Sequence, residues 1–147
     1  MKNKFKDFEL VEHTADIGLK IYGKDEKDLF INAARGMFFL ITGSRISLAP
    51  ESIRKYYALE SEAPGREDLL VTWLNDLLYI HFTDLVIFDD YIIDYISEEV
   101  IKSKVRAVEI KDSPYQIVKE IKAVTYHNLQ VCQNKNGIWE ANIVFDI

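Results

Sequence analysis

The segment REDLLVTWLNDLLYIHF, residues 66–82, carries the clearest helical pattern in the chain. Its apolar residues recur at intervals of three and four positions, which places them on one helical face. This stripe consists of Leu70, Trp73, Leu74, Leu77 and, at its end, His81. An apolar stripe of this width packs against a β-sheet, so we expect a helix with Trp73 in the core and His81 at the edge of the core.

Upstream of this helix the pattern indicates two short strands and another helix. Residues 8–11 and 17–22 alternate apolar with polar or small residues, which is the period of a half-buried strand. Asp25 is a suitable N-cap for the helix that follows, and Gly43 is a suitable stop. Residues 52–63 then read as a further strand, which ends at the turn residues Pro64 and Gly65.

Downstream the chain is rich in β-branched and aromatic residues. The expected strands cover residues 86–88, 91–96, 104–110, 121–132 and 138–145, and the polar connection 133–137 predicts that the last two form a hairpin. The pattern predicts an α+β protein built as a two-layer sandwich, with two main helices on one face of a mainly antiparallel or mixed sheet. We expect a single domain spanning residues 1–147.

Composition excludes several classes of function. The formal net charge of −6 argues against a broad surface for nucleic-acid phosphates, so contact with RNA is expected to be local or made through a partner. The lone Cys132 excludes an internal disulfide and suits the cytoplasm, and no stretch approaches the ~20 apolar residues of a membrane helix. The sequence lacks a glycine-rich phosphate loop and the motifs G-x-S-x-G and H-E-x-x-H. We therefore expect that this protein is not an enzyme.

The strongest chemical candidates are carboxylates near the two ends of the chain. Asp16 belongs to the polar cluster His13-Thr14-Ala15-Asp16 between two strands, and Asp146 precedes the terminal carboxylate of Ile147. If the last strand lies beside the first ones, these groups form an oxygen-only anionic cluster, which selects Ca²⁺, Mg²⁺ or Mn²⁺ over zinc. The alternatives are a structural loop at residues 13–16 and a solvated, frayed C-terminus.

A further candidate is Lys122, which lies among apolar residues in VKEIKAVTYHNL, residues 118–129. In a strand, Lys122, Val124 and Tyr126 would share one face. The functional interpretation places the Lys122 ammonium near the carboxylates or near a phosphate. The alternative is a strand lysine that extends over the sheet surface into water.

Four segments together resemble the archease family, and the likeness runs from Phe8 to the last residue. They are EHTADIG at residues 12–18, LLVTWLNDLLY at 69–79, IKAVTYHNL at 121–129 and FDI at 145–147. The chain departs from the family pattern between about residues 110 and 119, where it reads KDSPYQIV without the glycine usual there.

The resemblance implies a strand-helix-strand-strand core with an inserted segment. It also implies a protein cofactor of the RtcB-type RNA ligase of tRNA splicing, which promotes guanylylation of the ligase histidine and permits multiple turnover. On the same basis Asp16, Asp146 and Ile147 would form a calcium site, Lys122 would be needed for activity, and His127 belongs to the same motif.

Two other functions stay open at the level of the sequence. One is a chaperone-like interaction module that modulates RNA- or DNA-processing proteins without a required metal. The other is a stand-alone metal-dependent hydrolase built on the same carboxylates.

Overall fold

The computed structural model describes residues 6–12 and 16–147, which form helices and strands over most of their length. The regular elements are β1 (Phe8–Glu12), β2 (Ile17–Gly23), α1 (Glu26–Thr42), β3 (Arg54–Glu62), α2 (Arg66–Asp84), β4 (Val86–Ile96), β5 (Val100–Glu109), β6 (Ala123–Gln133) and β7 (Trp139–Asp146). Short 3₁₀ turns cover Glu51–Ile53 and Ile110–Asp112.

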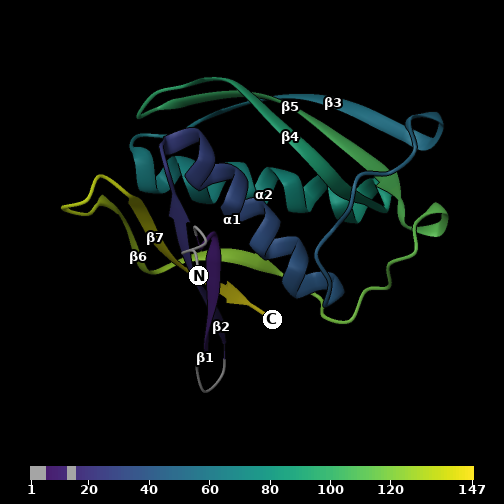
Figure 1. Ribbon diagram of the computed structural model, residues 1–147, viewed down its shortest axis with the longest axis horizontal. Coiled ribbons are helices and arrows are strands. Elements are labelled where there is room, and N and C mark those ends of the chain that lie inside the picture. The colour runs from purple at the N-terminus through teal and green to yellow at the C-terminus, as the bar shows by residue number, and fades with distance from the viewer. Residues whose placement is uncertain (1–5, 13–15) are drawn as a thin grey trace, which may run out of the picture.

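The strands form two antiparallel sheets, and the two helices lie between them (Figure 1). One sheet has the order β1-β2-β7-β6, and the other, with the order β3-β5-β4, is made by the chain inserted between α1 and β6. The predicted α+β class, with two main helices and antiparallel pairing, is confirmed. The helices are covered on both sides, however, whereas the sequence indicated a sheet on one side only.

Sheets cover the helices on both sides because the helices are apolar on more than one face. In α2 the consecutive residues Leu69, Leu70 and Val71 are all buried, and Leu78 is buried as well. A helix that is apolar around most of its circumference must be covered on both sides. The stripe recognised in the sequence therefore accounts for only part of the buried surface of α2.

The predicted ends of α1 are confirmed. The Asp25 carboxylate accepts a hydrogen bond from the Asp28 backbone N–H at 2.8 Å, and this cap begins the helix. Gly43 adopts a left-handed conformation with φ of 74° and donates its N–H to the Phe39 carbonyl at 2.7 Å, which ends it.

The strands of the inserted sheet differ from the sequence prediction in their boundaries. Residues 86–88 and 91–96 form one strand, β4, which is interrupted by a bulge between Phe88 and Asp90. β3 starts after a 3₁₀ turn, at Arg54, and β5 starts at Val100. The final hairpin of β6 and β7 is confirmed.

The core prediction for α2 is also confirmed. Trp73 is fully buried and donates its indole N–H to Ser103 Oγ at 3.0 Å, and His81 is 4% exposed with Nδ1 2.7 Å from the Val86 carbonyl oxygen. Against the other sheet, α1 approaches β2 closely, since a Cβ at Gly36 would lie 2.7 Å from Leu19 Cδ1. Neither α1 nor α2, the helices of the described part of the chain, has the length and apolarity required to cross a membrane.

Candidate functional site at the acidic ends of β2 and β7

The pairing of β2 with β7 brings Asp16 close to Asp146, near the C-terminus. These strands are antiparallel, and Ile17 is paired with Phe145. Asp16 and Asp146 are therefore the next positions along two neighbouring strands, where both strands reach the same end of the sheet. We call this end, with Asp16 and Asp146, the acidic edge. The condition set by the sequence, that the last strand lies beside the early ones, is met.

Lys122 arrives at the same edge from the other side of β7. Its backbone N–H donates to the Asp146 carbonyl oxygen at 2.8 Å, and Ala123, the first residue of β6, is paired with Asp146. Asp16, Asp146 and Lys122 thus mark the ends of three adjacent strands, in the order β2, β7 and β6. The backbone places two carboxylates and one ammonium-bearing residue side by side.

The side chains at this edge are accessible. Asp16 is half-buried, Asp146 and Lys122 are exposed, and Ile147 is 37% exposed. Among residues 6–12 and 16–147 no hydrogen bond or ion pair engages the side chains of Asp16, Asp146 or Lys122.

The donor set fits a hard cation. Two aspartates and the terminal carboxylate supply only oxygens, the ligand type that Ca²⁺, Mg²⁺ and Mn²⁺ prefer, and water would complete the ~6–8 ligands of Ca²⁺. Within the described residues no group of three or more His, Cys, Asp or Glu side chains could hold a metal ion.

The predicted alternation of faces does not extend to Lys122. This residue precedes β6 and is exposed, whereas Val124 is buried, so the two do not share an environment. Strand geometry begins only at Ala123, where pairing with β7 begins. His127 is exposed and lies where pairing between β6 and β7 is interrupted, between Thr125 and Gln130, while His13 and Thr14 lie outside the described residues.

The side-chain amide of Asn75 in α2 fixes the start of β6, a role that was not predicted from the sequence. The Asn75 side chain accepts a hydrogen bond from the Val124 N–H at 2.9 Å and donates to the Val124 carbonyl at 3.3 Å. The amide group pairs with this edge strand as a neighbouring strand would. An amide side chain within a largely buried helix is the signal that could have found it.

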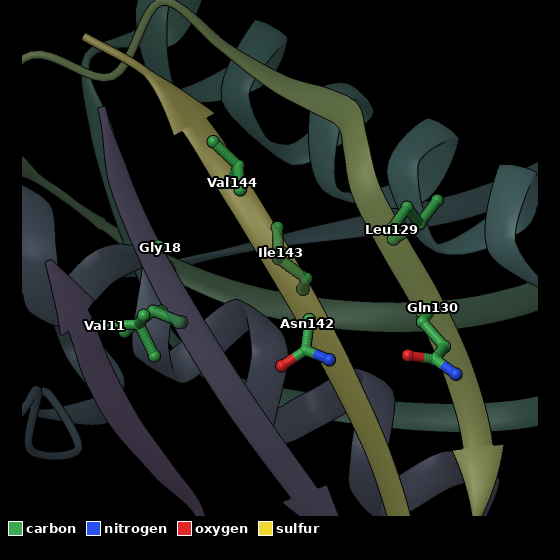
Figure 2. Close-up of a pocket in the computed structure, with 8 residues that line it drawn as sticks. Val11, Gly18, Leu129, Gln130, Asn142, Ile143 and Val144 are labelled. Carbon is green, nitrogen blue, oxygen red and sulfur yellow. The ribbon is translucent and has the colours of Figure 1, made fainter. Parts of the chain in front are cut away.

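A hollow of about 670 Å³ lies on the outer face of the same sheet, and Figure 2 shows the helices behind it. It crosses all four strands, from Val11 of β1 through Gly18 and Val144 to Leu129 and Gln130 of β6. Gly18, which is paired with both Val11 and Val144, lies in the middle of this lining. Its lining among the described residues is apolar apart from the amide side chains of Gln130 and Asn142.

The described residues form a layer of two helices enclosed by two antiparallel sheets, with Asp16 and Asp146 side by side at the ends of two central strands. The chain belongs to the Archease protein family (MTH1598/TM1083), whose model matches residues 8–147.

Named relatives support this membership over the full length. The proteins called archease from Methanosarcina barkeri and Methanosarcina acetivorans are 34% and 35% identical to the chain. Each alignment covers 100% of this chain and 100% of the relative. The solution structure of Methanobacterium thermoautotrophicum protein 1598 is 32% identical, with a TM-score of 0.71 over 97% of this chain and 100% of that one. A crystal structure from Thermotoga maritima, described as an archease and possible chaperone, shares the fold at 23% identity, with a TM-score of 0.63 over both whole chains.

Proposed function

We propose that this protein is a non-enzymatic activator of an RtcB-type RNA ligase in tRNA splicing, which promotes guanylylation of the ligase and permits multiple turnover. Membership of the archease family supports the proposal, as does the resemblance of its sequence motifs. The observation that carries it is the placement of Asp16, Asp146 and Lys122 at the ends of three adjacent strands.

The acidic edge is the surface that meets the ligase. Asp16, Asp146 and the Ile147 carboxylate hold a divalent cation, with Ca²⁺ favoured and Mg²⁺ or Mn²⁺ as alternatives. Such a cation supplies positive charge that neutralises developing charge in phosphoryl transfer. The continuous ladder from Ile17–Phe145 to Gly23–Trp139 fixes the backbone next to the two aspartates.

Lys122 presents its ammonium at the same edge, where it contacts a phosphate or an acidic group of the ligase. With a net charge of −6, the protein meets RNA at most indirectly, through the ligase. This function belongs in the cytoplasm and requires no membrane contact.

A time course of ligase guanylylation tests this function. The cognate ligase is incubated with GTP alone, with the wild-type protein, and with Asp16→Asn or Asp146→Asn. We expect the wild type to raise the rate and each variant to lose most of the stimulation, because each removes one anionic group from the edge. Asp112→Asn, an exposed carboxylate in the 3₁₀ turn after β5, is the matched control and should stimulate fully.

Two results would count against the proposal. Equal guanylylation rates with and without the wild-type protein would reject activation altogether. Full stimulation by both Asp16→Asn and Asp146→Asn would reject the carboxylate edge while leaving activation in place.

A chaperone-like interaction module is the second candidate, and the hollow on the outer sheet face favours it. The Thermotoga maritima structure is described as a possible chaperone. In this function the outer sheet face, with Val11 39% exposed, contacts RNA- or DNA-processing proteins without a metal. Partner binding that persists in EDTA and with Asp16→Asn, but fails with Val11→Lys, would favour it over the activator.

A further inference from the structure

Four strands lie at the edges of the two sheets in the described part of the chain, and three of them are protected against pairing with another chain. Proteins protect an edge strand by keeping it short, by a bulge or by a covering contact. β1 is short, with five residues, and β4 shifts its register against β5 at two places. β6 is interrupted after Thr125, and its start is bonded to Asn75. The remaining edge strand, β3, has none of these features.

β3 is regular over its whole length. Its nine residues, Arg54–Glu62, are all paired with β5 without a shift of register. Apart from this ladder, no hydrogen bond among residues 6–12 and 16–147 engages the backbone of residues 55–62. Alternate residues of an antiparallel strand direct their N–H and C=O groups to one side, so about half of these groups are left for another strand. Lys55, the one lysine of the strand, is held by Glu109 of β5 at 3.3 Å.

The charges of β3 favour an antiparallel copy of the same strand as its partner. Arg54 and Lys55 begin the strand, whereas Glu60 and Glu62 end it. An antiparallel copy that overlaps all nine residues sets Arg54 opposite Glu62 and Lys55 opposite Ser61, so no like charges are directly opposed. A parallel copy in the same register would set each of these charges opposite itself.

The same alignment matches the two faces of the strand. Ala58 lies at the centre, opposite its own copy, and is exposed and small, so no large side chain keeps the two strands apart. On the face turned to the helices, where Tyr57 donates its hydroxyl to Asp84 of α2, Tyr57 is opposite Leu59 of the second copy. Tyr57 and Leu59 are only half-buried against the core, and pairing covers more of their apolar surface.

We propose that β3 pairs with β3 of a second copy of this chain, antiparallel and with Ala58 opposite Ala58 on a two-fold axis. The pairing joins two inserted sheets of three strands into one sheet with the order β4-β5-β3-β3-β5-β4. One strand from each copy forms the contact, so the interface is small and the dimer is weak. The acidic edge belongs to the other sheet, on the far side of the helices (Figure 1), so the dimer leaves it exposed in both copies. The pairing is therefore independent of the proposed function.

Sedimentation equilibrium of the whole chain tests this pairing. The wild type is measured from about 10 µM to about 1 mM, the range in which a small interface dissociates. We expect the mean mass to rise with concentration from that of one chain towards that of two. A mass that stays at one chain, or that keeps growing beyond two chains, would overturn the proposal.

Ala58→Lys tests whether β3 forms the contact. The substitution sets two ammonium groups opposite each other on the two-fold axis, so the dissociation constant of the dimer should rise at least about tenfold. Ile92→Lys adds the same charge at an exposed position of β4, the other edge strand of the same sheet, and should dimerise as the wild type does. An unchanged dimer in Ala58→Lys, or an equal loss in Ile92→Lys, would contradict pairing through β3.

Disulfide crosslinking tests the register, in a Cys132→Ser background because Cys132 is exposed. Treated with oxidised glutathione, Ala58→Cys should form a covalent dimer, since directly opposite Cα atoms lie about 4.5–5.5 Å apart and a disulfide spans this distance. Glu60→Cys is the control and should crosslink at least about tenfold less, because its two copies lie roughly 13 Å apart along the strands. Equal yields from the two variants, or no covalent dimer from Ala58→Cys, would contradict the proposed register. This measurement decides the outcome if Ala58→Lys does not fold.

Discussion

The terminal carboxylate of Ile147 is the residue-scale feature on which the proposed cation site depends. Asp16 and Asp146 supply only two side-chain carboxylates at this edge, and the described residues contain no cluster of three metal-binding side chains. Because Asp146 is the last residue of β7, the terminal carboxylate one residue later cannot move far from it.

Adding a single glycine after Ile147 should therefore lower stimulation of ligase guanylylation, because it moves the terminal carboxylate by up to roughly 3.6 Å. Guanylylation rates measured over a range of activator concentrations check this. A chain with one residue added before Met1 is the control and should stimulate normally. Equal stimulation by the chain extended at its C-terminus would show that the terminal carboxylate is not a ligand.

His81 gives the fold a pH dependence that can be separated from that of the carboxylates. Burial lowers its pKa below the ordinary value of 6.5. The unfolded chain therefore binds a proton at a higher pH than the folded chain does. As the pH falls from about 6.5 towards the folded-state pKa, stability should decrease by up to about 1.4 kcal/mol per pH unit.

Urea unfolding of the wild type and of His81→Gln between pH 7.5 and 5.5 measures this contribution. Glutamine can donate to the Val86 carbonyl but does not titrate, so the variant should show a flatter dependence in this window. The same change of unfolding free energy with pH in the two proteins would contradict a role for His81.

Individual residues were predictable from the sequence where the pattern around them was strong. Trp73 and His81 lie on a helical stripe, and both are buried as expected. Asn75 carried only the weaker signal of an amide in a buried helix, and Asp89 carried none, because their partners are distant in sequence: Asn75 bonds to β6, and Asp89 bonds to the segment before β3.

At the scale of the element, the end of α1 depends on one backbone conformation. Gly43 has a φ of 74°, and a Cβ there would lie 3.3 Å from Val118 Cγ2. Gly43→Ala should cost about 1–2 kcal/mol, because an L-residue is strained in the left-handed region. Gly65→Ala is a matched control, since Gly65 precedes α2 with an extended φ of 171° and a Cβ would meet nothing within 4 Å. Similar unfolding free energies for the two variants in urea would contradict this account.

The contact between α2 and β6 gives a second prediction at this scale. Asn75→Ala removes the partner of both the N–H and the carbonyl of Val124, and should destabilise the protein by about 1–3 kcal/mol. Thr72→Ala on the same helix is the control. Chemical denaturation of both variants measures the loss of unfolding free energy. A loss no greater for Asn75→Ala than for Thr72→Ala would mean that the two hydrogen bonds between Asn75 and Val124 contribute nothing to stability.

Helix caps and the final hairpin were predictable because their signals are local. Asp25, Gly43 and the polar connection at residues 133–137 act through neighbours in sequence. The bulge in β4 was not, since it is defined by register against β5. The sequence therefore indicated two strands where the chain forms one.

At the scale of the whole molecule, the sequence predicted the class of fold but not the number of sheets. Strand content and antiparallel pairing follow from composition and turns, whereas the division into two sheets depends on which strands pair. The four-stranded sheet joins the first two strands of the chain to the last two, and the inserted sheet closes the other side of the helices. This pairing, visible only in three dimensions, brings Asp16 to Asp146. The assignment of residues 1–147 to a single domain stays a prediction.

Calorimetric titration of Ca²⁺ into the wild-type protein and into Asp16→Asn tests the proposed cation site without the ligase, because it measures cation binding where β2 and β7 place Asp16 beside Asp146. We expect one saturable site in the wild type and an affinity at least about tenfold lower in the variant, which lacks one of the three anionic groups. Saturable binding of equal affinity in both proteins, or no binding in the wild type, would contradict the account.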